Sequence, residues 1–160
     1  MRGTILAACI AALVAALPAV AQDQEWPEGS AMHVGGLEAK RRDAAVATLA
    51  KLHRRLVTLI STATSSVPPD DRLIMAVQAQ QVAWNSYVLD ECELIGSLTG
   101  SGGSWPSTYS VRCHANLLEL RIRRTNAAIR CVEKLPAATR QFEQNQCLYQ
   151  LAPLAVPLRP

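Results

Sequence analysis

The stretch that decides the fold is Cys92-Glu-Leu-Ile-Gly-Ser-Leu-Thr-Gly-Ser-Gly-Gly-Ser-Trp-Pro-Ser-Thr-Tyr-Ser-Val-Arg-Cys113. Its middle part, residues 96–106, is rich in glycine and serine, which is typical of a loop. The segments on both sides repeat apolar residues every three or four positions, which is the period of an amphipathic helix. The stretch therefore predicts two helices joined as a hairpin, with one cysteine near the loop end of each helix.

Outward from this hairpin, the same periodicity predicts four helices in all. They cover residues 37–62, 69–95, 107–135 and 137–150. Ser107 or Thr108 is the expected N-cap of the third helix, and Pro136 makes a corner before the fourth.

Each of the three long helices has one apolar stripe. The stripe of the first helix comprises Val46, Leu49, Leu52, Leu56, Leu59 and Ala63. The stripe of the second comprises Leu73, Val77, Gln81, Trp84, Val88 and Cys92. The stripe of the third comprises Tyr109, Cys113, Leu117, Leu120, Arg124 and Ala127. The predicted fold class is therefore all-α: a small antiparallel bundle of about four helices, stapled by two disulfides.

The helical domain is expected to span residues 37–150. Residues 22–36, which contain proline and glycine and have no apolar period, predict a flexible or loosely docked leader. Residues 151–160 contain three prolines and predict an extended tail.

Residues 1–21 have the features of a secretory signal. A basic start at Arg2 precedes an unbroken apolar run from Ile5 to Leu17, and the small residues Ala19-Val20-Ala21 follow. The apolar run is too short to span a bilayer comfortably, so a transmembrane helix is the weaker interpretation. Cleavage after Ala21 would place the mature protein in the periplasm or outside the cell, with no integral membrane segment.

The tetrapeptide Leu6-Ala7-Ala8-Cys9 resembles the lipidation signal of bacterial lipoproteins. A lipidated cysteine follows the apolar run of its signal, whereas Cys9 lies inside this run. Lipoprotein anchoring is therefore not expected.

Four cysteines remain after signal cleavage, and an even number in an exported chain predicts two disulfides. Cys92 and Cys113 lie close to the hairpin loop on inward faces, and Cys131 and Cys147 flank the Pro136 corner. These positions favour the pairs Cys92–Cys113 and Cys131–Cys147. A Cys92–Cys131 bond would instead join points far apart along the third helix.

Several kinds of ligand are not expected from the sequence. No cysteines stand at the close spacing of a zinc site, so no metal is predicted. The glycine-rich loop lacks the lysine of a phosphate-binding loop, so no nucleotide or other cofactor is predicted. The formal net charge is only +3, and loss of Arg2 with the signal lowers it by one, so nucleic-acid binding is not expected.

The hairpin also carries an ordered series of residues: Gln81-x-x-Trp84-x-x-Tyr87-x-x-x-x-Cys92, then Gly102-Gly103-Ser104, then Tyr109-x-x-x-Cys113, then Leu120-x-x-x-Arg124-Thr125. This series, within about residues 70–135, resembles the LprI-like family of exported bacterial proteins. That family is named for a mycobacterial lipoprotein that inhibits lysozyme, so the resemblance implies a lysozyme-type hydrolase as the partner. The shared motif itself resembles a structural element made of a disulfide, its packing and its loop.

The resemblance makes the loop the candidate for partner binding. Lysozyme-type enzymes hold two carboxylates in an open cleft. A loop that offers hydroxyl groups and a large side chain could plug such a cleft. The candidate residues in the 97–105 loop are Ser97, Ser101, Ser104 and Trp105, with Trp105 as the expected anchor.

Two other function classes remain open from the sequence. An envelope structural or adaptor module could use an arginine-rich third helix to meet an acidic surface. Its arginines are Arg112, Arg121, Arg123, Arg124 and Arg130. An enzyme is not expected, because the histidines His33, His53 and His114 lie in three separate segments and no nucleophile has a recognisable neighbourhood.

Overall fold

The computed structural model describes residues 26–62 and 71–152. The predicted signal lies outside these residues, as does the predicted tail from residue 153 onward. The elements are α1 (Ala31–Ser61), α2 (Asp71–Ser97), α3 (Trp105–Lys134), α4 (Arg140–Leu148) and a short 3-10 helix η1 (Tyr149–Leu151). The described residues contain no strand, so the all-α prediction is confirmed.

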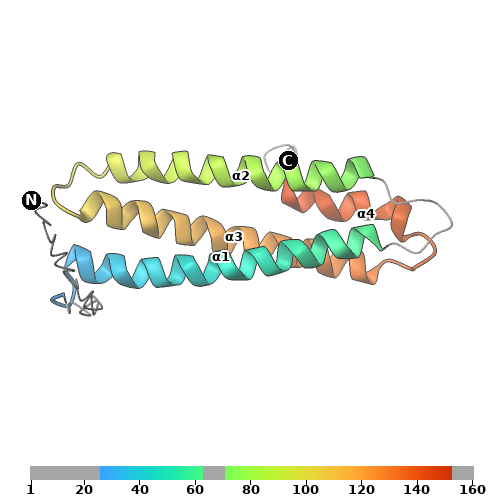
Figure 1. Ribbon diagram of the computed structural model, residues 1–160, viewed down its shortest axis with the longest axis horizontal. Helices are drawn as coiled ribbons and strands as arrows, with labels where there is room; N and C mark the ends of the chain where they lie inside the picture. The colour runs from blue at the N-terminus through green and yellow to red at the C-terminus, as the bar shows by residue number, and fades with distance from the viewer. Residues whose placement is uncertain (1–25, 63–70, 153–160) are drawn as a thin grey trace, which may run out of the picture.

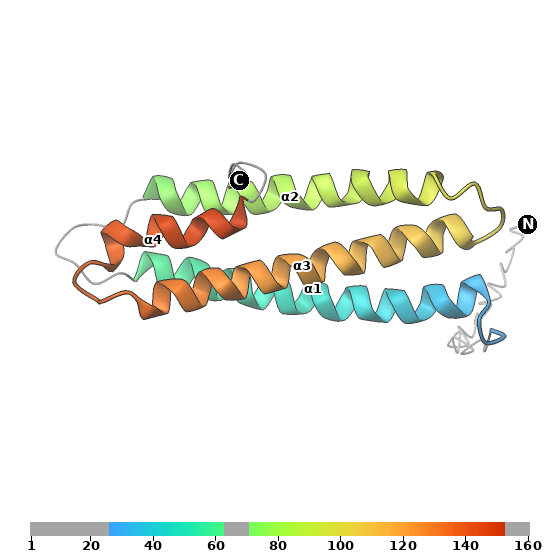
Figure 2. The same ribbon diagram turned by 180° about the vertical axis from the view of Figure 1, so that it is seen from behind.

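The three long helices lie side by side and give the molecule an elongated shape (Figure 1). Consecutive helices are antiparallel, so α1 and α3 run in the same direction. The α2–α3 loop lies at one end, which we call the hairpin end. The short helix α4 folds back at the opposite end, which Figure 2 shows from behind. No helix in the described part of the chain has the combination of length and apolarity that crossing a bilayer requires.

Helix α3 is the central helix, because it packs against both α1 and α2. Its most deeply buried side chains therefore differ from the single face that periodicity predicted. That predicted face contains Cys113, which bonds to α2. The buried residues are Thr108, Ala115, Leu118, Arg121, Thr125, Ala128, Ile129 and Val132. The residues of the predicted face are only partly buried, because this face meets α2 while the buried residues lie elsewhere on the helix.

The apolar core has two parts. Toward the hairpin end, Ala45 and Leu49 of α1 pack on Leu118 of α3. At the other end α4 and η1 complete a larger cluster, which comprises Leu56, Ile60, Val77, Ala128, Ile129, Leu148 and Leu151. The α1 stripe is thus shifted by one position at its start, since Ala45 is buried while the predicted Val46 is exposed.

Helix α1 begins at Ala31, so the leader predicted over residues 22–36 is wrong for its last six residues. Ser30 supplies the missing start signal, because its Oγ accepts a hydrogen bond from the backbone N–H of His33 at 3.2 Å. The first turn also docks on α3, where Thr108 Oγ1 donates to the carbonyl oxygen of Ala31 at 2.8 Å. A β-carbon at Gly35 would lie only 3.0 Å from the Thr108 hydroxyl, so glycine allows this close approach.

Two other boundaries also differ from the prediction. Helix α3 begins at Trp105 with Ser104 in the N-cap position, rather than with Ser107 or Thr108. Helix α4 begins at Arg140, because a turn in which Arg140 N donates to the Pro136 carbonyl at 2.9 Å precedes it. Leu151, the first residue of the predicted tail, is buried in η1 instead of extended.

Both predicted disulfides are present, Cys92–Cys113 and Cys131–Cys147. In each pair the Cα atoms are 5.4 Å apart, within the usual range for a disulfide. The first bond ties α2 to α3 near the hairpin end, and the second ties α4 to α3. Two disulfides are expected of a protein that folds in an oxidising compartment.

Candidate functional site

The hairpin end is the candidate site, because it carries the loop singled out from the sequence. Residues 98–104 connect α2 to α3, and Gly100 and Gly103 adopt positive φ angles of 61° and 66°. These values lie in the left-handed region, which glycine enters without steric cost. The glycines therefore shape a tight connection, and they leave the loop from Gly100 to Gly103 exposed to solvent.

The serines of the loop are partly engaged in local hydrogen bonds. Ser97 Oγ donates to the carbonyl oxygen of Glu93 at 3.0 Å, and Ser101 Oγ donates to that of Thr99 at 3.3 Å. The carbonyl oxygen of Ser104 accepts from the Thr108 backbone N–H at 3.1 Å. These serines stabilise the shape of the loop, and their hydroxyl oxygens remain able to accept from a partner.

The apolar side chain that protrudes from this end is Leu98 rather than Trp105. Trp105 is the first residue of α3 and is half-buried, with its ring centroid 5.9 Å from that of Tyr109. Leu98 is 70% exposed. Leu98 was not predicted as the anchor, because aromatic side chains are the more common anchors of interfaces. Its position between Ser97 and Thr99, outside any apolar stripe, nevertheless indicates an exposed side chain.

The loop ends are held close together. A β-carbon at Gly96 would lie 2.7 Å from the backbone oxygen of Pro106, so only glycine permits the last turn of α2 to approach the first turn of α3 this closely. The Cys92–Cys113 disulfide fixes the same two helices one turn further from the tip. The loop therefore starts and ends on a rigid base.

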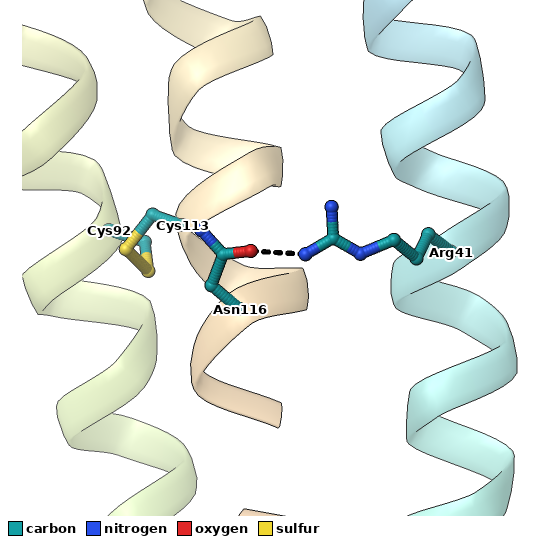
Figure 3. The surroundings of a disulfide bond; sticks show 4 residues. All are labelled: Arg41, Cys92, Cys113 and Asn116. Atoms are coloured by element: carbon teal, nitrogen blue, oxygen red, sulfur yellow. Dashed lines mark hydrogen bonds between the residues drawn. A yellow bond between two sulfur atoms is a disulfide. The ribbon is translucent and has the colours of Figure 1, made fainter. Parts of the chain in front are cut away.

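Helix α3 is also fixed to α1 at this level (Figure 3). Arg41 of α1 donates to the side-chain oxygen of Asn116, while Cys113 bonds to Cys92 from the adjacent turn of α3. Arg41 Nε also donates to Glu119 at 2.7 Å. The disulfide and the Arg41 contacts thus hold α3 between its two neighbours.

Another ion pair links the same helices. Glu38 of α1 accepts from Arg112 Nε at 2.9 Å and from Arg41 Nη1 at 2.6 Å. Toward the other end, Arg55 Nη2 donates to Glu133 at 2.6 Å. The pairs Arg112–Glu38 and Arg55–Glu133 therefore join α1 to α3.

Gln81 and Trp84 of α2 surround Arg121, whose burial was not predicted from the sequence. Arg121 is only 3% exposed. Its Nε and Nη2 donate to Gln81 Oε1 at 3.2 and 3.1 Å, and its Cζ lies 5.3 Å from the centroid of the Trp84 ring. Tyr87, another residue of the same series, is exposed on α2.

The carbonyl oxygen of Leu151 and the amide of Gln80 complete the shell. Arg121 Nη1 donates to the Leu151 oxygen at 2.6 Å, and Nη2 donates to Gln80 Oε1. Gln80 Nε2 in turn donates to the same Leu151 oxygen at 3.1 Å. Burial lowers the pKa of Arg121 to about 10, and the nearby charge of Arg124 contributes. Arg121 thus fastens η1 to α2 and α3, which is a structural role.

The arginines of α3 do not form a continuous basic surface. Arg121 is buried, and Arg112 is paired with Glu38. Arg123 and Arg130 are exposed, and Arg124 is partly buried. The adaptor hypothesis requires a continuous positively charged surface on α3, and the helix does not present one.

A groove separates α1 from α2 above the floor formed by α3. Its volume is about 450 Å³. His53 of α1 and His114 of α3 line it together with Gln81 and Asn85 of α2. The Nε2 atom of His53 is buried and has no hydrogen-bond partner among the described residues.

Burial lowers the pKa of both groove histidines. For His53, a hydrogen bond to the backbone of Val77 partly opposes this shift, and the charge of Arg121 adds to it. For His114, the charge of Arg42 adds to the effect of burial. Both imidazoles are therefore more readily protonated in the unfolded chain than in the folded protein.

Acid is expected to destabilise the protein through these histidines. The free energy of unfolding should fall as the pH drops below about 6.5, where unfolded histidine takes up a proton that the folded protein resists. Denaturant titrations between about pH 7.5 and about pH 5 measure this slope. The double variant His53→Asn, His114→Asn should lose most of it, and an unchanged slope would show that other groups cause the pH dependence.

No metal centre is evident in the described residues, where no cluster of three or more histidine, cysteine or acidic side chains has the arrangement for one.

Comparison with known proteins gave no matching family model, no matching curated protein and no matching solved structure. A function for this chain must therefore come from its own residues and geometry.

Proposed function

We propose that this protein is an exported, non-enzymatic binding protein that blocks the cleft of a lysozyme-type hydrolase with its hairpin end. The observation that carries the proposal is the exposed side chain of Leu98 on a loop held at both ends. Because the loop base is already rigid, binding would order few additional groups, which reduces the entropy lost on association.

The chemistry of the loop suits an acidic cleft. From Ser97 to Ser107 the chain contains no charged residue, so no carboxylate would repel the two carboxylates of such an enzyme. Leu98 supplies apolar contact area, and the exposed Gly100–Gly103 segment permits close approach of its backbone to the cleft walls.

Two features support export as the setting of this function. The sequence of residues 1–21 has the order of a secretory signal, and the disulfides Cys92–Cys113 and Cys131–Cys147 require an oxidising compartment to persist. Peptidoglycan hydrolases act in the same compartments.

The first test is inhibition of peptidoglycan lysis by lysozymes of the c, g and i types, with the oxidised protein added in increasing amounts. We expect stoichiometric inhibition of one type. Absence of inhibition for every type would refute the proposal and leave an envelope adaptor as the function to pursue.

The variant Leu98→Asp tests the loop itself. It should weaken inhibition by about 2 kcal/mol, or roughly thirtyfold, because it removes the protruding apolar side chain and adds a charge that the cleft repels. Phe142→Asp is the matched control, since Phe142 is also 70% exposed but belongs to α4 at the other end. Equal inhibition by both variants would exclude the hairpin end as the binding surface.

A further inference from the structure

Arg54 differs from the other arginines of α1, because it has no carboxylate partner among the residues that the structure describes. The other three are all paired, as Arg41–Glu38, Arg42–Asp43 and Arg55–Glu133. Arg54 lines the groove between α1 and α2, and none of the described residues that line this groove is acidic. The opposite wall cannot supply a carboxylate, since α2 has no acidic residue from position 72 to position 89. The groove therefore holds a positive charge that its own walls do not neutralise.

The polar wall on α2 offers donors, because the buried Arg121 fixes the orientation of two amides. Arg121 Nε and Nη2 donate to Gln81 Oε1 at 3.2 and 3.1 Å. An arginine can only donate, so Gln81 must turn its oxygen toward it, and Gln81 Nε2 then donates to Asn85 Oδ1 at 2.9 Å. The oxygen of Asn85 is thus engaged, and the two N–H groups of its Nδ2 remain for an acceptor in the groove.

The part of the groove nearer the hairpin end is apolar. Leu49 of α1 and Leu118 of α3 pack together at the floor, and the exposed side chains of Val46 and Leu89 stand on the two rims. Val46 precedes Arg54 by eight residues, which corresponds to about 12 Å along α1. The lining therefore changes from apolar to cationic along the length of the groove.

The two histidines add no charge to the groove near neutral pH. Burial lowers the pKa of both His53 and His114 from the ordinary value of histidine. Both imidazoles are therefore neutral at pH 7. Arg54 is then the only charged side chain among the described residues that line the groove.

We propose that this groove binds a small organic anion with an apolar body, namely a carboxylate that carries a single hydrocarbon chain. The carboxylate accepts hydrogen bonds from Arg54 and from Nδ2 of Asn85, and hydrogen bonds between charged groups are the stronger ones. The chain lies on Leu49 and Leu118, where it is removed from water. The volume of the groove, about 450 Å³, is within the range of small-molecule sites.

The ligand site does not depend on the function proposed for the hairpin end. Asn85 and Leu98 are separated by 13 residues of α2, which corresponds to about 20 Å. Because Leu98 is not part of the groove, the protein can hold the anion and engage a hydrolase independently. Failure to inhibit any lysozyme would refute the proposed function and would leave the ligand site to be tested separately.

Titration of the isotope-labelled, oxidised protein with decanoate tests the site by NMR. At concentrations below those at which decanoate forms micelles, we expect saturable shifts of amide signals around Asn85 and Leu118. Decanol has the same chain without the charge and should bind about tenfold more weakly, because the charge-assisted hydrogen bonds are lost. Acetate, which has no chain, should not saturate. Absence of saturable shifts with decanoate, or equally tight binding of decanol, would overturn the proposal.

Two pairs of variants test the residues that hold the carboxylate. Asn85→Asp should weaken decanoate binding about tenfold or more, because a negative charge replaces the two donors. Asn145→Asp adds the same charge to an exposed position of α4 and should have no effect. Arg54→Gln should weaken decanoate binding about tenfold and leave decanol binding unchanged, whereas Arg123→Gln should change neither. Circular dichroism checks that each variant keeps its helical fold. Equal binding of decanoate by all four variants would overturn the assignment of these residues.

A membrane is the other source of the same chemistry, since an anionic lipid also combines a negative group with hydrocarbon chains. Vesicles of anionic phospholipid distinguish the two sources in a sedimentation assay. The proposal expects free decanoate to bind and the protein to remain in the supernatant. Retention of the protein on the vesicles, without binding of free decanoate, would overturn the proposal in favour of a membrane-bound lipid.

Discussion

Replacement of Arg121 by alanine is expected to lower the free energy of unfolding by about 3–4 kcal/mol. The substitution leaves the Leu151 carbonyl and the side-chain oxygen of Gln81 without their charged donor, and it opens a space beneath Trp84. It also removes the hydrogen bond that ties η1 to α3 and leaves the bond from Gln80 of α2 to the Leu151 oxygen. Urea denaturation monitored by circular dichroism measures the change.

Two further variants separate this effect from a general loss of charge. Arg123→Ala removes an exposed arginine of the same helix and should change the stability by no more than about 0.5 kcal/mol. Arg121→Lys keeps the charge but lacks the planar group that reaches Gln80, Gln81 and Leu151 together, so its stability should lie between those of Arg121→Ala and the unchanged protein. If Arg121→Ala were as stable as Arg123→Ala, the buried network would have no structural importance.

The contacts of Arg121 could not be predicted from the sequence, because its partners come from two other segments, α2 and η1. The adaptor hypothesis grouped the arginines of α3 together, although their spacing already distinguishes them. Arg121 stands seven residues from His114 and from Ala128, so it shares the side of α3 that faces the groove and the core. Arg123 and Arg130 project elsewhere and are exposed.

The helices and both disulfides were predictable, because they depend on local pattern and chain geometry. Apolar steps of three and four residues identify a helix whatever it packs against, and short loops limit which cysteines can meet. The start of α1 depends instead on a distant contact, from Thr108 to Ala31. The exposure of Leu98 and the half-burial of Trp105 likewise depend on how α2 and α3 pack against each other, which the sequence pattern does not specify.

Removal of the disulfide near the hairpin end is the second large expected effect. The double variant Cys92→Ala, Cys113→Ala should lose about 3 kcal/mol of unfolding free energy, because the bond closes a loop of about 20 residues and restricts the unfolded chain. The double variant Cys131→Ala, Cys147→Ala is the matched control, because the bond that it removes closes a loop of similar length. Both should be destabilised to a similar degree.

The two variants should differ in function and in local motion. Without the Cys92–Cys113 bond, Arg41 still holds α3 to α1 through Glu119, whereas the last turn of α2 loses its covalent tie. Amide hydrogen exchange should therefore accelerate from Cys92 to Ser97 but not in the first turn of α3. If the proposed inhibition of a hydrolase is found, it should weaken in this variant more than in the control, since binding must then order a loop that was previously held. Equal inhibition by the two variants would mean that the rigid base of the loop makes no contribution to binding.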